Sequence, residues 1–456
     1  MPLFQIKMKK GYLIFICVIF LYAQETLWVR IFDQGAKEAG AALCFDNQGN
    51  ILIAGGIWRS RETKWDVLFV KYTPNGEIIW TRYYDSGQSE GASCVELDRE
   101  GNIVIGGGSG NDTVELQFFV AKFSSEGELI WRRDYRAGDL SCFYDLFIDD
   151  DNNIILCGDT YTYSGGGKSI AALFKYDANG NLLWKKFYNW AHSFYKMVPL
   201  SDSCFLVLGD IFDVAAHGFR ILLIKFNSDG EPIWIKRYEG RRNFDYWAGG
   251  LALDSLGNII VGGYELDINN NYDILLIKFT PNGDTIWSKR LNLIRFEEYI
   301  SEVKIDKFGN IYAAGAIGKI DTCDYLLIKF TPDGETIWTT RYDNNDKDDK
   351  IVDLIIDSEN NPIVTGYSRR YDYSDLDCLT IKYHGGTGIS ENFKQLISSN
   401  ILQSNVERVE IYDINGRLIK KTKESQISLK EIKNGVYFIK IVANKKIYIK
   451  KLIKVY

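Results

Sequence analysis

The sequence predicts an all-β protein, with a seven-bladed β-propeller closed by an N-terminal strand and then a small antiparallel β-sandwich. Three observations predict this fold class. The 456 residues include 41 Gly, only 7 Pro and 14% aromatic residues, a composition that favours short strands and tight turns over helices. A tryptophan recurs at spacings of 50 to 53 residues. The last fifty residues alternate apolar and polar side chains around an Asn-Gly pair, which is a hairpin signal.

The recurring tryptophans mark seven copies of one pattern between residues 26 and 383. One clear copy reads LALDSLGNIIVGG (251–263) and then DILLIKFTPNGDTIW (273–287). Asp-x-x-Gly-Asn and Pro-Asn-Gly each predict a tight turn between apolar runs, so each copy is expected to form four short strands. A period near fifty residues is typical of propellers. The seven repeat tryptophans are Trp28, Trp80, Trp131, Trp184, Trp234, Trp287 and Trp338.

The order of the strands predicts how the ring closes. The first copy begins with a lone fourth strand at residues 25–32, and the last copy ends at Tyr383 after its third strand. We therefore expect the N-terminal strand to complete the last blade beside residues 377–383. Such a clasp removes the open sheet edge that invites aggregation.

The N-terminus has the pattern of an export signal over residues 1–23. Three lysines precede the apolar run of residues 12–22, which is too short to cross a bilayer as a helix. We expect the signal to be cleaved, leaving a mature chain that does not span a membrane. The predicted domains are then the propeller (24–383), a linker (384–404) and the C-terminal β-sandwich (405–456).

The net charge of −6 is unevenly distributed. Residues 401–456 hold 13 Lys and Arg against 5 Asp and Glu, which leaves about −17 for residues 24–400. An acidic main body argues against nucleic acid as a partner.

The two parts of the chain each resemble a known family. The wording D-x-x-GN-I, then D-x-LL-x-K-F-TP-x-G and a tryptophan, is similar to the bacterial β-propeller repeats called SBBP or delta-60 type. Kelch repeats share a distant likeness. The C-terminal segments IYDINGRLIKK, ISLKEIKNGVYFIKI and KKLIKVY resemble the C-terminal sorting domain of type IX secretion cargo. That second resemblance implies export over the outer membrane, to the cell surface or the medium, with the type IX secretion machinery as a partner of the tail. The alternative is an ordinary accessory sandwich.

No local motif predicts catalysis, a metal or a cofactor. The three His lack metal-ligand spacing, and neither a Gly-x-Ser-x-Gly elbow nor a phosphate-binding loop occurs. The cysteines are scattered singly and are expected to be free and buried. Each third strand carries one Lys, which we expect to pair with a nearby acid: Lys71, Lys122, Lys175, Lys225, Lys278, Lys329 and Lys382.

One face of the propeller is predicted to bind a ligand. The turns within Asp-x-x-Gly-Asn and Pro-Asn-Gly are uniform, whereas the connections at the other end of the strands differ in every copy. Rigid scaffolds often carry binding sites on such loops, and exposed Trp, Tyr and Arg are typical of recognition patches. The predicted function is an exported, non-catalytic scaffold that binds a glycan, a peptide or a surface protein. The alternative is a secreted hydrolase or lyase that uses loop carboxylates. A further alternative is that the aromatic residues in these loops only fill the opening at the centre of the ring. The candidate residues are Trp58, Arg59, Arg61, Trp65, Tyr161, Tyr163, Trp190, Arg241, Arg242, Tyr246, Trp247, Arg369, Arg370 and Tyr371.

Overall fold

The computed structural model describes most of residues 26–386 and four strands near the C-terminus. The described ranges are 26–59, 64–112, 115–163, 167–215, 218–241, 245–266, 272–294, 297–319, 321–344, 347–369, 375–386, 406–413, 417–422, 435–443 and 446–454. The predicted signal (1–23) and the Asn415-Gly416 turn lie outside these ranges. Every regular element among the described residues is a β-strand. This part of the chain contains no helix with the length and apolar character that a bilayer crossing needs.

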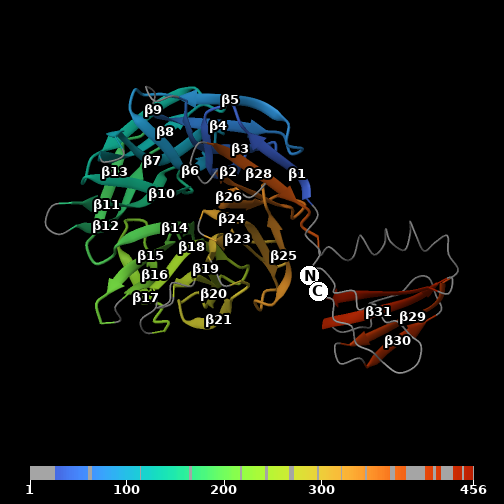
Figure 1. Cartoon of the computed structure of the whole chain (residues 1–456). Coiled ribbons are helices and arrows are strands. Elements are labelled where there is room, and N and C mark those ends of the chain that lie inside the picture. Colours follow the sequence, from blue (N-terminus) through green and yellow to red (C-terminus); the bar gives the residue numbers. More distant parts are fainter. Residues whose placement is uncertain are drawn as a thin grey trace.

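The strands form repeated four-stranded antiparallel sheets in sequence order, which Figure 1 shows arranged around a common centre. The first four sheets after the N-terminal strand are β2 (Lys37–Phe45) to β5 (Ile78–Tyr84), β6 (Ser89–Leu97) to β9 (Leu129–Tyr135), β10 (Leu140–Ile148) to β13 (Leu182–Tyr188) and β14 (Ser193–Pro199) to β17 (Pro232–Arg237). Two more are β18 (Asp245–Leu253) to β21 (Thr285–Leu291) and β22 (Glu297–Ile305) to β25 (Thr336–Tyr342).

The inner strands of these sheets are β3 (Ile51–Trp58), β4 (Trp65–Tyr72), β7 (Ile103–Asp112), β8 (Glu115–Phe123), β11 (Ile154–Thr162), β12 (Lys168–Tyr176), β15 (Phe205–Asp213), β16 (Gly218–Phe226), β19 (Ile259–Leu266), β20 (Tyr272–Phe279), β23 (Ile311–Lys319) and β24 (Thr322–Phe330).

The N-terminal strand joins the last strands of the propeller region. β26 (Asp348–Ile356), β27 (Pro362–Arg369) and β28 (Leu376–Tyr383) form a sheet in sequence order, and β1 (Thr26–Phe32) pairs antiparallel with β28. In this register Trp28 lies opposite Lys382. A single parallel bridge between Lys37 and Leu376 also connects β2 to β28. We call this junction of β1, β2 and β28 the seam.

The first strands of the sheets pack against one another near the centre. β2 contacts β6, β6 contacts β10, and the contacts continue in order to β22 and β26, which contacts β2. The third strands are covered on both faces, as their unbroken apolar runs predict: Val67, Leu68, Phe69 and Val70 of β4 are all fully buried. The apolar core accordingly consists of separate clusters between neighbouring sheets.

Each repeat tryptophan is the third residue of a fourth strand, or of β1, and most pack on the turn of the next sheet. Trp287 lies against Gly334, and Trp131 against Gly180, where an added Cβ would come within 2.9 Å and 2.8 Å of the indoles. Both glycines have positive φ, which side chains tolerate poorly. The indole N–H of Trp131 also donates to the Ala178 carbonyl at 3.2 Å. The tryptophans thus join neighbouring sheets, as predicted.

Each repeat lysine pairs with an Asp in the turn between the first and second strands of its own sheet. In six copies this is the first residue of the Asp-x-x-Gly-Asn position. In the fourth copy Leu200 takes that position, and Lys225 pairs with Asp202, two residues further along the turn. The distances run from 2.5 Å to 3.1 Å, so the predicted pairing is confirmed in all seven copies. Burial opposes ionisation of Asp46, but hydrogen bonds from Lys71 and Asn50 keep its pKa below the usual value. The seven pairs are Lys71–Asp46, Lys122–Asp98, Lys175–Asp149, Lys225–Asp202, Lys278–Asp254, Lys329–Asp306 and Lys382–Asp357. All seven described cysteines are free, as expected.

The C-terminal strands form one antiparallel sheet of β30 (Leu418–Thr422), β29 (Val406–Asp413), β31 (Gly435–Ala443) and β32 (Lys446–Lys454), in that order. The described residues of this unit make a single layer, so the two-layer sandwich stays a prediction.

Candidate functional site

The candidate site lies at one end of the propeller sheets, which we call the variable-loop face. It carries the connections between second and third strands, such as β3 to β4, and between successive sheets, such as β1 to β2. Because neighbouring strands are antiparallel, these connections emerge at the same end of each sheet. The uniform turns lie at the opposite end, where Asp46 and Gly49, for example, close the β2–β3 turn.

A cavity of about 230 Å³ opens on this face at the seam. We call it the Trp65 pocket, and its lining residues are Lys37, Ala39, Trp65, Tyr367, Arg369 and Leu376. They come from β2, β4, β27 and β28, so both ends of the propeller sequence contribute. Aromatic and aliphatic walls with a few charged groups are typical of small-ligand sites.

Two indoles from adjacent strands lie beside this pocket. Trp58 and Trp65 are register partners in the β3–β4 pair. Trp65 packs over Gly56, where an added Cβ would come within 3.0 Å of the ring. The ammonium of Lys37 lies 4.5 Å from the centre of the Trp58 ring, a favourable cation–π distance. Glycine at position 56 therefore allows the indole of Trp65 to approach the backbone of β3 closely.

Arg369 forms the charged wall of the pocket. Its Nη2 donates to Asp348 Oδ2 at 2.6 Å and to Asp321 Oδ1 at 3.3 Å, and its side chain is 17% exposed. Its guanidinium carbon also lies 6.0 Å from the centre of the Tyr367 ring. Asp348 is fully buried, so this ion pair holds the guanidinium in a fixed position.

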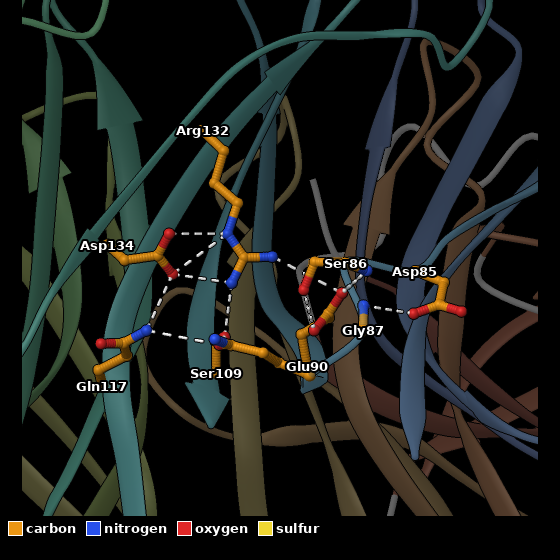
Figure 2. A network of polar contacts seen from close by, with 9 residues as sticks. Asp85, Ser86, Gly87, Glu90, Ser109, Gln117, Arg132 and Asp134 are labelled. Atoms are coloured by element: carbon orange, nitrogen blue, oxygen red, sulfur yellow. Dashed lines mark hydrogen bonds and ion pairs between the residues drawn. The ribbon is translucent and has the colours of Figure 1, made fainter. Parts of the chain in front are cut away.

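A partly buried polar network joins strands of the second sheet to the β5–β6 connection (Figure 2). Arg132 Nη2 donates to Ser109 Oγ at 2.5 Å and to Asp134 Oδ1 at 2.7 Å, and Nη1 lies 3.6 Å from Glu90 Oε1. Glu90 also accepts the Ser86 N–H at 2.7 Å and the Ser86 hydroxyl at 2.8 Å. Burial raises the pKa of Glu90. The network anchors the β5–β6 connection, and a polar cavity of about 90 Å³ beside it is lined in part by Ser109.

A second polar cluster tests the enzyme alternative. Ser193 Oγ donates to Asp159 Oδ2 at 2.5 Å and lies 3.2 Å from His192 Nδ1, while Asp210 Oδ1 lies 3.4 Å from the same nitrogen. A nucleophilic serine needs its base to meet the serine and the acid through different nitrogens. The hydrogen bond to Asp210 raises the pKa of His192, which favours the imidazolium. Ser193 and Asp210 are also buried, so the cluster has the geometry of a structural network.

Three carboxylates meet at the seam, and we call them the seam triad: Asp33, Glu38 and Asp377. Asp33 directly follows β1, Glu38 belongs to β2 and Asp377 to β28. One oxygen of each lies within 4.8 Å of the others. Burial, and the nearby charges of Asp33 and Asp377, raise the pKa of Glu38 to about 7 against the hydrogen bond from Gln34.

Comparisons with known proteins support both parts of the chain. Residues 391–455 match the secretion system C-terminal sorting domain, and residues 257–285 match a domain of unknown function described as a β-propeller, DUF5122. The chain carries β-propeller repeats and a C-terminal sorting domain. The sorting domain indicates export by type IX secretion, to the cell surface or the medium.

More distant relatives add no function. A WD repeat-containing protein of Acanthamoeba polyphaga mimivirus is 21% identical over 388 residues, and the match covers 66% of this chain and 26% of that protein. The crystal structure of the polysaccharide lyase Uly1 is 11% identical, with a TM-score of 0.48 over 76% of this chain and 90% of the lyase. The WD40 domain of Neurospora crassa Pan2 is 7% identical, with a TM-score of 0.47 over 80% and 97%.

The propeller brings some of the candidate residues together and separates others. Trp65 and Arg369 line the Trp65 pocket, and Trp58 is the register partner of Trp65. Arg59 pairs with Asp66 at 2.6 Å on the neighbouring junction. Arg61, Arg242, Arg370 and Tyr371 lie outside the described residues.

The remaining candidates lie against other sheets. Tyr163 is 53% exposed and packs edge-on against Tyr161 at 5.2 Å. Trp190 packs on an apolar cluster between sheets. Tyr246 is fully buried, and its hydroxyl accepts the Arg241 N–H, so its side chain is not available to a ligand. Trp247 packs against Phe219, with ring centres 4.8 Å apart.

Sequence reasoning missed the pocket residues Lys37, Ala39, Tyr367 and Leu376, and also the Arg132 network and the seam triad. Lys37 and Leu376 are the first residues of a first and a third strand, next to the variable loops. The residues at the loop-facing ends of the first and third strands are therefore the positions at which sequence analysis could have found Lys37 and Leu376.

Proposed function

We propose that the chain is an exported seven-bladed propeller, closed by β1, whose variable-loop face binds a ligand without catalysis. The successive contacts of the first strands, including β26 with β2, support a closed ring. The antiparallel pairing of β1 with β28 supports the N-terminal strand as its clasp. We propose the boundaries 24–383 for the propeller, 384–404 for the linker and 405–456 for the sorting domain.

The observation that carries the binding proposal is the Trp65 pocket. It combines the apolar surfaces of Trp65 and Leu376 with the cations Lys37 and Arg369 in about 230 Å³. Aromatic and arginine side chains with restricted freedom contribute strongly to recognition, because little conformational entropy is lost on binding. The pocket would accept one anionic group of a ligand and one apolar face, as an acidic glycan or an acidic peptide of a surface partner presents.

The proposal predicts which side chains a ligand needs. The mature chain is screened on a glycan and peptide array, and hits are measured again with the Trp65→Ala and Lys37→Gln variants. We expect both variants to lose at least tenfold in affinity. Tyr163→Ala is the matched control, because Tyr163 is an exposed aromatic on the same face and does not line the pocket. Binding that survives Trp65→Ala but is lost in Tyr163→Ala would place the site elsewhere on the face.

A further inference from the structure

The seam triad holds buried carboxylate oxygens that meet no donor within the described part of the chain. Glu38 is fully buried, and its Oε1 accepts the Gln34 N–H at 3.0 Å, while Oε2 has no hydrogen-bond partner among the described residues. Asp377 is 3% exposed, and its Oδ2 accepts Lys347 Nζ at 2.7 Å, while Oδ1 has no partner within the same residues. Buried oxygens of this kind are costly unless a donor or a cation meets them.

Equivalent acids occur at other junctions, where arginines meet them. Asp66, Asp85 and Glu90 occupy the corresponding positions between the first and second sheets. There Arg59 Nη2 lies 2.6 Å from Asp66 Oδ2, and Arg132 lies near Glu90. A third such junction comprises Asp324, Asp343 and Asp349, whose carboxylate oxygens also lie within 4.8 Å of one another.

The seam and that third junction have different residues at one position of the outermost strand, which is β1 at the seam and β25 at the third junction. Leu326 of β24 lies opposite Arg341, and Arg341 pairs with Asp324. Leu379 is the residue of β28 that corresponds to Leu326, because Leu326 pairs with Gly315 of β23 and Leu379 pairs with Gly366 of β27. On its other side, Leu379 lies opposite Ile31 of β1. The seam therefore has an isoleucine where its neighbour has a guanidinium, and Lys347 is the cation that reaches Asp377.

We propose that the seam triad binds a divalent cation of the Ca²⁺ class, which links the clasp strand β1 to β2 and β28. Ca²⁺ binds oxygens at about 2.3–2.6 Å, so two oxygens on one ion lie at most about 5.2 Å apart. The three carboxylates meet that condition without moving, since their nearest oxygens lie within 4.8 Å of one another. Water completes the six to eight ligands that Ca²⁺ takes, on the side of exposed Asp33.

The site suits the destination of an exported chain. Extracellular Ca²⁺ sites work with dissociation constants of about 10⁻⁴–10⁻³ M. With all three carboxylates ionised, the triad carries three negative charges, and Lys347 is the cation paired with it among the described residues; a bound divalent ion favours that ionised form. A cation here acts on closure of the propeller and not on ligand recognition, so it is independent of the function proposed for the Trp65 pocket.

The test uses the mature full chain, stripped with EDTA and then titrated with CaCl₂. We expect the Tm to rise by about 2 °C or more at millimolar Ca²⁺, because the ion binds the folded state alone. Tb³⁺ luminescence should report the same site directly. The Glu38→Gln variant keeps an acceptor for the Gln34 N–H but removes one charge, and it should lose both signals. Asp33→Asn, a change of an exposed side chain, serves the same purpose should Glu38→Gln fail to fold.

The matched control is Glu90→Gln, at the corresponding position where Arg132 lies nearby. It should keep the Ca²⁺-dependent rise in Tm. No change of the wild-type Tm with Ca²⁺, or an equal rise in the Glu38→Gln and Asp33→Asn variants, would overturn the proposal. An equal response to Mg²⁺ would refute the Ca²⁺ class.

Discussion

The seven Lys–Asp pairs form a natural series in which one interaction is placed at different depths. Lys329 and Asp306 form the most deeply buried pair, with side chains 3% and 0% exposed and a distance of 3.1 Å. Lys225 and Asp202 form a shorter contact, 2.7 Å, but their side chains are 21% and 53% exposed. Replacing each lysine by methionine removes the charge and keeps most of the side-chain volume. The two variants therefore compare burial with the chemistry held constant.

We expect Lys329→Met to lower the free energy of unfolding by about 3–5 kcal/mol, because it leaves a buried carboxylate without its partner. The ammonium of Lys329 also donates to the Tyr312 hydroxyl and the Gly385 carbonyl, each at 2.7 Å, and both acceptors lose that donor. Lys225→Met should cost about 1 kcal/mol or less, as exposed pairs do. Burial lowers the pKa of Lys329, because taking the ammonium out of water disfavours its charged form.

Urea denaturation followed by tryptophan fluorescence measures both costs, provided that the m-values stay equal to that of the wild type. The double variant Lys329→Met with Asp306→Asn should recover part of the loss, since it removes the unpaired charge. Equal losses in Lys329→Met and Lys225→Met would refute the reasoning. They would mean that the pairs act through a feature common to all sheets and not through burial.

Three further predictions concern the sheets, the centre and the tail. Trp287→Ala should destabilise the chain by about 3 kcal/mol, the lower end of the range for a large aromatic, because the indole is only partly buried. Gly334→Ala should also destabilise the chain, since the φ of +76° and the nearby indole of Trp287 exclude a methyl group. The midpoint of urea denaturation measures both effects. Burial raises the pKa of Asp145 from 3.8 to about 6, so between these values the folded chain holds a proton that the unfolded chain releases. The contribution of Asp145 to the free energy of unfolding therefore falls as the pH rises from about 4 to 6.5. Asp145→Asn should make the urea midpoint depend less on pH over this range. Deleting residues 391–456, which include the region matched by the sorting domain, should retain the propeller inside the outer membrane, as cell fractionation would reveal.

Apart from the pairing of β1 with β28, which the order of the strands predicts, the parts of the fold that the sequence predicts lie within one repeat. The Lys–Asp pairs, the turns and the position of each tryptophan depend on residues close to one another in the chain, so their periodic recurrence reveals them. The Trp65 pocket and the seam triad were missed, because Lys37 and Arg369, or Glu38 and Asp377, come from opposite ends of the propeller sequence. Tyr246 illustrates the converse error, since an aromatic beside a variable loop gives no local sign that it turns inward.

The first strands of the sheets, which pack near the centre of the propeller, carry different residues at equivalent positions, so the repeats are not equivalent there. Each has a register shift at the same place, and the residues that follow it include Asp145, Lys196, Gly250 and Glu302. Lys196 Nζ reaches Glu302 Oε2 at 2.7 Å, past the sheet that holds Gly250. An added Cβ on Gly250 would come within 2.4 Å of the Val303 nitrogen, so a side chain there would push β22 away. Gly250 and Lys196 therefore depend on each other. Replacing either residue disturbs the ion pair between Lys196 and Glu302, which joins two sheets that are not neighbours. A model of stability that sums only single repeats and contacts between adjacent repeats omits this interaction.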